Sequence, residues 1–196
     1  VAARIIAEKK QGYAVLAVVS AMNTTTEDLL KAAREVNPQP SPREMDMLLS
    51  TGEQVSVSLL AMAVEGMGHD VISLTGGMCG IVTDQRHKKA RIAEVNASRI
   101  VKELEAGKIV IAAGFQGVTR DGDITTLGRG GSDTTAVALA AAVKAERCDI
   151  YTDVDGIYSA DPRRIARARL LSCISHDEML EMSRLGAGVL STRSVE

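Results

Sequence analysis

The sequence predicts an α/β fold in which a largely parallel sheet is covered by helices on both faces. Segments with helical periodicity alternate with short apolar runs along the chain, a pattern typical of parallel strands joined by helices. Two of these runs, residues 13–19 and 108–115, are almost continuously apolar, as in strands that are buried on both faces. Hydrophobic residues make up 45% of the chain but aromatic residues only 2%, so aliphatic side chains must fill the core.

The first part of the chain predicts a helix, a buried strand, a polar turn and a second helix. Residues 1–11 have helical periodicity, and Gly12 ends this helix before the strand 13–19. The turn, residues 20–26, contains a serine and several threonines at the end of a strand, where open α/β sheets bind ligands. The same side chains can instead cap the helix 27–36, and both alternatives stay open.

The rest of the chain continues the alternation. Residues 119–126 predict a hairpin that turns at Asp121-Gly122-Asp123. Ser175 and Glu178 have the spacing of a capping box at the start of a helix. The remaining expected helices are residues 45–49, 50–68, 97–106, 136–147 and 179–185, and the remaining expected strands are 70–75, 90–95, 108–115, 148–154 and 170–174.

Composition and charge argue against several classes of protein. A formal net charge of −2 provides no electrostatic footprint for nucleic acid or an anionic membrane. The scarcity of aromatic residues also argues against surfaces on which bases stack. The basic run at residues 86–91 is typical of a solvated face, and no motif surrounds the histidines, which are His69, His87 and His176.

The cysteines and the chain ends suggest the cellular setting. The three cysteines (Cys79, Cys148 and Cys173) lack metal-ligand spacing and predict reduced, mostly buried thiols of a cytoplasmic protein. No apolar run approaches the length that spans a membrane. The chain starts at Val1 and ends at Glu196 within helical patterns, so we expect both ends to be cut.

The glycine-rich stretch 127–135 is the principal candidate site. It precedes an apolar helix, and a glycine-rich loop before a helix lets backbone N–H groups approach an anion. It also holds Arg129, Ser132 and Asp133, so it carries a group that can grip a carboxylate or phosphate. The alternative is a flexible loop with an ordinary serine helix cap.

Glu53 is the second candidate. Its neighbours along the chain, which include Leu48, Leu49 and Val57, are largely apolar. A carboxylate in such surroundings is either functional or on the solvent face of its helix, and periodicity alone does not decide between the two.

Five ordered blocks cover almost the whole chain. They are Val19-Ser20-Ala21-Met22, Leu49-Ser50-Thr51-Gly52-Glu53, Phe115-Gln116-Gly117, Gly128-Arg129-Gly130-Gly131-Ser132-Asp133 and Tyr151-Thr152-Asp153-Val154-Asp155-Gly156-Ile157-Tyr158. Together they resemble the aspartokinase family of the amino acid kinase superfamily. The resemblance implies a three-layer αβα sandwich over residues 1–196, a catalytic domain with MgATP and L-aspartate end to end across the C-terminal edge of its sheet. The implied reaction phosphorylates the side-chain carboxylate of L-aspartate, the first step towards lysine, threonine and methionine.

The resemblance also implies roles for individual residues. Glu53 would face the α-amino group of aspartate, Arg129 would hold its α-carboxylate, and Asp133 would organise a phosphate-binding lysine. The residues implied on the aspartate side are Ser20, Thr26, Glu53, Arg129, Ser132 and Asp133, and those implied on the ATP side are Thr152, Asp153, Tyr158, Asp161 and Arg163. Mg²⁺ would be held mainly by the nucleotide phosphates, with no metal ligand assigned in the chain.

The implied chemistry suits these residue types. A carboxylate is already a competent nucleophile at neutral pH, so the reaction needs no strong general base and the lack of a credible catalytic histidine is expected. Phosphoryl transfer instead requires two anions held in line and neutralisation of the charge on the moving group.

The chain departs from the family pattern in three respects. It has no strand with the Lys-x-Gly-Gly motif that cradles the transferring phosphate, and no C-terminal regulatory domains of the ACT type. Gly188 stands where many members carry a lysine, for which Arg193 is a nearby substitute. We therefore expect most of a catalytic domain that is inactive as the chain stands.

Two other readings remain. Acetylglutamate kinase, glutamate 5-kinase and uridylate kinase share the implied fold, although the loop at Arg129 favours aspartokinase. The chain could also be a non-catalytic assembly subunit, but a scaffold has no need of Glu53, Arg129, Asp133 and Asp153 in these loops. The resemblance further implies a homo-oligomer, and it identifies no feedback effector.

Overall fold

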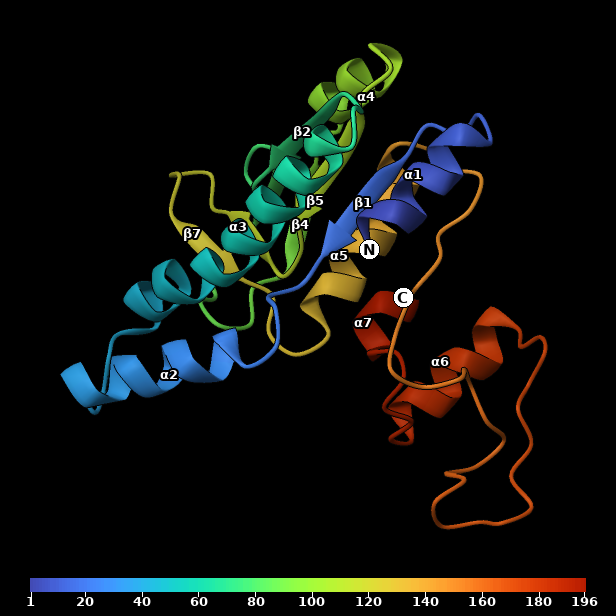
Figure 1. Cartoon of the computed structure of the whole chain (residues 1–196). Helices are drawn as coiled ribbons and strands as arrows, with labels where there is room; N and C mark the ends of the chain where they lie inside the picture. Colours follow the sequence, from blue (N-terminus) through green and yellow to red (C-terminus); the bar gives the residue numbers. More distant parts are fainter.

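Three parallel strands form the centre of the computed structural model, which describes residues 1–196 (Figure 1). Their order is β1 (Leu16–Val19), β5 (Ile109–Ala113) and β2 (Val71–Leu74), so β5 lies in the middle. Each residue of β5 is fully buried, since the strand is hydrogen-bonded on both edges and covered on both faces. The predicted parallel sheet and the strand expected at residues 108–115 are confirmed. The strand expected at residues 13–19 is shorter, and its residues are half-buried where burial on both faces was expected.

Alternate side chains of β5 face two helical layers. Ile109, Ile111 and Ala113 share a cluster with residues of α1 (Ala2–Lys10) and α3 (Pro42–Gly66). Val110 and Ala112 point the other way. They share a cluster with Ile100 of α4 (Ser98–Glu105) and Leu139 of α5 (Gly131–Ala142). These clusters make the three layers of an αβα sandwich.

A second, mixed sheet adjoins the first, with strand order β4 (Ile92–Val95), β3 (Ile81–Thr83), β6 (Gln116–Val118) and β7 (Ile124–Thr126). β6 and β7 pair antiparallel around the expected turn, but the first strand of the hairpin lies at Gln116–Val118, before the predicted range 119–126. β3 and β6 are parallel. The other helices are α2 (Thr25–Val36), α6 (His176–Arg184) with its capping box, and α7 (Thr192–Val195).

α3 is one continuous helix where the sequence suggested two. Ser41 caps it by accepting a hydrogen bond from the Glu44 N–H, and Pro42 occupies the first turn. By length and composition the helix is apolar enough to span a membrane, contrary to the expectation for this chain. It packs against β1, β2, β5 and β7 and buries the polar residues Asp46 and Glu53, which is the behaviour of a core helix.

Two expected strands are absent. Residues 148–154 pair with no other strand, and their side chains Tyr151 and Val154 are 64% and 45% exposed. An apolar run becomes a strand only when a neighbour completes its hydrogen bonds, and here the Tyr151 ring instead stacks on Arg4 at 4.6 Å. Of residues 170–174, only Leu170 pairs, in an isolated bridge with Tyr158.

The thiols also differ from expectation. Cys79 is fully buried, and burial raises its pKa to about 12. Cys148 and Cys173 are exposed because they lie in and near the segment that forms no strand. The expectation of mostly buried thiols was therefore wrong.

The burial of β5 predicts a large effect for a substitution within it. Ile111→Ala should lower the free energy of unfolding by about 3 kcal/mol, since it removes buried methylene groups and leaves a cavity. The measurement is urea denaturation followed by circular dichroism. Ile165→Ala is the matched control because Ile165 is 51% exposed, and its loss should stay below about 1 kcal/mol. Equal losses for the two variants would contradict this description of the core.

Candidate functional site

A pocket of about 280 Å³ opens where β1 and β5 end. The carboxyl ends of parallel strands are the usual place for a ligand in an open α/β sheet. Residues from five parts of the chain line it: Ser20 and Ala21 after β1, Thr26 of α2, Glu53 of α3, Phe115 after β5, and residues 128–133. All six residues expected on the aspartate side are among them.

Glu53 is the least satisfied polar group of this pocket. Its side chain comes from the middle of α3, and the residue is 3% exposed. One carboxylate oxygen accepts the Ala21 N–H at 3.1 Å, but the other, Oε2, is buried without a hydrogen-bond partner. Burial raises the pKa of the carboxyl group. Burying a carboxylate with one unpaired oxygen costs free energy, and a cationic ligand bound to that oxygen would offset this cost.

The glycine loop places Arg129 at the mouth of the pocket. Gly130 has a φ of +71°, and a Cβ there would lie 2.7 Å from the Cβ of Ser191, so only glycine fits. Arg129 itself is exposed and forms no hydrogen bond or ion pair within the chain. Its guanidinium is therefore available to a carboxylate.

α5 begins at Gly131, immediately after this loop. Its first-turn N–H groups lie beside Ser132 and Asp133, and a helix N-terminus favours anions. Burial raises the pKa of the Asp133 carboxyl group. Phe115 borders the same loop with a φ of +69°, and its N–H donates to Thr135 Oγ1 at 3.1 Å. Strained backbone of this kind gathers at functional sites.

The residues expected on the ATP side do not line the pocket. They belong to residues 152–163, a segment without helix or strand that runs outside the layers (orange in Figure 1). Apart from the bridge between Tyr158 and Leu170, their contacts are local. Thr152 donates to Asp153 at 3.2 Å, and Asp161 accepts the backbone N–H of Arg163 at 3.0 Å. Tyr158 donates to a neighbouring aspartate, Asp155, at 3.4 Å.

Arg193 does not occupy the position expected of a substitute for the lysine missing at Gly188. Its guanidinium donates to the carbonyl oxygens of Leu127 at 2.9 Å and Ala90 at 3.5 Å. It thus braces the start of the glycine loop, and it does not stand free as a substitute for a lysine at Gly188.

Sequence reasoning missed Asp46, which is fully buried on α3 and contacts the residues just before the glycine loop. One signal was available, because Asp46 lies seven residues before Glu53 and so falls on the same face of a helix. His87, to which no function was assigned, has its Nδ1 atom 2.8 Å from Asp46 Oδ2.

Chemically, the pocket pairs a buried anion with an exposed cation. The unpartnered oxygen of Glu53 can accept from an ammonium group, and Arg129 can hold a carboxylate in a fork. The arrangement suits a small zwitterion such as an amino acid.

Comparisons with known proteins agree with this picture. The sequence profile of the amino acid kinase family matches residues 1–196. Aspartokinase 2 of Bacillus subtilis is 58% identical over 98% of the chain, and the chain spans 47% of that protein, about half its length. Aspartate kinase from Synechocystis superposes with a TM-score of 0.84 at 48% identity, covering 99% of this chain and 32% of that one. Aspartokinase III of E. coli, in complex with aspartate and ADP, gives a TM-score of 0.76 at 35% identity, covering 86% and 38%.

The unsatisfied Glu53 carboxylate predicts that removing its charge stabilises the fold. Burial raises the folded-state pKa above the unfolded value, so the charged form carries a penalty that appears as pH rises through the folded-state pKa. Glu53→Gln should therefore be about 1 kcal/mol more stable than the natural chain at about pH 8, and the difference should shrink towards about pH 4.

Thermal unfolding at the two pH values measures the effect. Glu65→Gln is the control, since Glu65 is exposed on the same helix and its variant should unfold like the natural chain. A destabilised Glu53→Gln at the higher pH would show that this carboxylate is satisfied after all.

Proposed function

The chain belongs to the amino acid kinase family, and from that premise we propose that it forms most of an aspartokinase catalytic domain. The reaction would transfer the γ-phosphoryl group of ATP to the side-chain carboxylate of L-aspartate, giving 4-phospho-L-aspartate. The observation that carries the proposal is the buried, unpartnered oxygen of Glu53 in the same pocket as Arg129. The names of relatives that are 55–58% identical support it further.

We assign the two ends of the amino acid to the two charged groups. The ammonium group would donate a hydrogen bond to Glu53. It would thereby give this buried carboxylate the positively charged partner that the chain does not provide. The α-carboxylate would be gripped by Arg129, and Ser20, Thr26 and Ser132 would line the remaining space. With both ends held, the side-chain carboxylate is the one nucleophilic group of aspartate left free.

Catalysis would then consist of positioning and charge neutralisation. The aspartate carboxylate attacks the γ-phosphorus, the bond to the β–γ bridging oxygen breaks, and ADP leaves. The first turn of α5 lines the pocket at Gly131, Ser132 and Asp133, and the N-terminus of this helix can stabilise negative charge there. We assign the nucleotide to Thr152, Asp153, Tyr158, Asp161 and Arg163, and Asp133 to the orientation of a phosphate-binding lysine. MgATP supplies the phosphoryl group, and the nucleotide phosphates would hold the Mg²⁺.

A non-catalytic scaffold fits the site less well. A buried carboxylate oxygen without a partner lowers the stability of the fold, and an assembly subunit gains nothing from it. We further propose that the intact protein is a cytoplasmic homo-oligomer acting in the synthesis of lysine, threonine and methionine, with aspartate and MgATP as its ligands.

A substrate panel tests the proposal in the full-length protein that contains this chain. ADP release should depend on L-aspartate and should be absent with N-acetylglutamate, glutamate or UMP. Arg129→Lys should raise the KM for aspartate about tenfold or more, since lysine cannot form the two-pronged contact. Arg120→Lys is the control because Arg120 is 81% exposed in its side chain and lies outside the pocket. ADP release with one of the other acceptors but not with aspartate would refute the assignment.

A further inference from the structure

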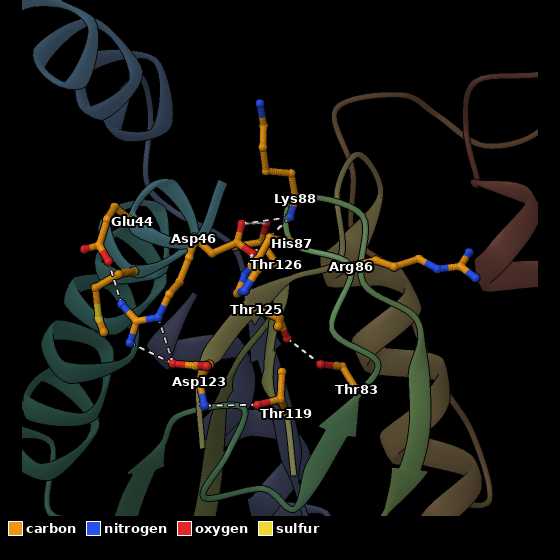
Figure 2. A network of polar contacts seen from close by, with 12 residues as sticks. Glu44, Asp46, Thr83, Arg86, His87, Lys88, Thr119, Asp123, Thr125 and Thr126 are labelled. Carbon is orange, nitrogen blue, oxygen red and sulfur yellow. Dashed lines mark hydrogen bonds and ion pairs between the residues drawn. The ribbon is translucent and has the colours of Figure 1, made fainter. Parts of the chain in front are cut away.

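Asp46 is the centre of a buried polar network beside the glycine loop (Figure 2). The residue is 0% exposed, and its carboxylate accepts hydrogen bonds from three residues of other elements. Thr126 Oγ1 donates to Oδ1 at 2.6 Å, and the Lys88 N–H lies 3.0 and 2.9 Å from the two oxygens. His87 Nδ1 lies 2.8 Å from Oδ2. Unlike Glu53, this carboxylate is therefore satisfied, by contacts that reach 41 to 80 residues along the chain.

The network shapes the segment of residues 84–91, which joins β3 to β4. Lys88 has a φ of +67°, a conformation that a residue with a side chain adopts only when its surroundings hold it there. The Asp46 carboxylate is that support, since it accepts the Lys88 N–H with both oxygens. At the other end of the segment, the Ala90 N–H donates to the carbonyl oxygen of Thr126 at 3.0 Å.

The 84–91 segment lies directly against the glycine loop. Gly128 has a φ of +80°, and a Cβ at this position would lie 3.0 Å from the carbonyl oxygen of Lys88. Arg193 joins the same two elements through its hydrogen bonds to the carbonyl oxygens of Leu127 and Ala90. The backbone immediately before Arg129 is thus packed against a segment whose conformation depends on Asp46.

α3 carries both Asp46 and Glu53, two turns apart on one buried face. One carboxylate lines the pocket, and the other anchors the residues that precede the arginine across the pocket. A single rigid helix therefore relates the positions of the two charged groups that would hold the amino acid.

We infer that Asp46 is a positioning residue for aspartate binding, which fixes the Arg129 loop relative to Glu53 through Thr126 and Lys88. The inference rests on the proposed function. Asp46 touches neither substrate, and its effect is confined to the amino acid end of the site, because its partners pack on the glycine loop and none belongs to residues 152–163.

The two adjacent threonines of β7 provide a matched pair of variants. Thr126 and Thr125 are 1% and 0% exposed, and each hydroxyl group forms one short hydrogen bond of 2.6 Å to another side chain. Thr126 bonds to Asp46, whereas Thr125 bonds to Thr83 on the opposite face of the strand. Replacement by valine removes one buried hydroxyl group in each case, and only Thr126→Val disturbs Asp46.

The experiment measures KM for aspartate, KM for ATP and kcat in the full-length protein. Thr126→Val should raise the KM for aspartate about three- to tenfold, the range expected for one lost hydrogen bond to a charged group, and should leave the KM for ATP within about twofold. Thr125→Val should leave both KM values within about twofold of the natural protein. The melting temperatures of the two variants should fall by similar amounts. Equal effects of the two variants on the KM for aspartate, or a parallel rise in both KM values for Thr126→Val, would overturn the inference.

Asp46→Asn is the direct variant, and it should raise the KM for aspartate by at least about tenfold, since the amide nitrogen then replaces an oxygen that accepts hydrogen bonds from two donors. It should also speed amide hydrogen exchange at Lys88. If this variant fails to fold, the comparison of Thr126→Val with Thr125→Val tests the inference. A natural protein without aspartate-dependent ADP release would overturn the proposed function, whereas an active protein insensitive to Thr126→Val would overturn only the role of Asp46.

Discussion

The burial of two carboxylates by α3 is the constraint on which the site depends. Burying a charge is costly unless hydrogen bonds or an opposite charge compensate for it. The hydrogen bonds that satisfy Asp46 all come from the chain. They are donated by the 84–91 segment and β7, which therefore lie beside each other around this carboxylate. Glu53 receives only the Ala21 N–H, so its second oxygen remains available to a ligand. The same helix thus buries one carboxylate that the chain satisfies fully and one that it leaves open to a ligand.

The sheet supplies what this arrangement needs, a fixed frame. β5 is packed on both faces and paired on both edges, and the turns that follow β1 and β5 emerge beside each other because the strands are parallel and in register. The pocket residues to which we assign the amino acid lie at and beside these turns, on elements with strong tertiary support. The residues assigned to the nucleotide lie instead in a segment held by short-range contacts, so the two halves of the site differ in how firmly the chain positions them.

Much of the fold and the lining of the pocket could be predicted from the sequence, because both leave local signals. The continuous apolar runs predicted β1 and β5, and the rule that ligands bind at strand ends pointed to the turn at Ser20. The Arg129 loop was found because it is rich in glycine and precedes a helix. The role of Asp46 leaves no such signal, since its partners lie 41 to 80 residues away and only the folded chain brings them together. The strand expected at residues 148–154 failed for a related reason, because pairing depends on a neighbour that a local pattern cannot reveal.

Phe115 has a consequence of a different kind. It is the only phenylalanine of the chain, and it lines the pocket in a left-handed backbone conformation held by Thr135. Backbone ¹⁵N labelling or a single ring fluorine on phenylalanine would therefore give this chain a single resonance, located at the pocket. Because the chain has so few aromatic residues, Phe115 can serve as a spectroscopic reporter of ligand binding in the pocket.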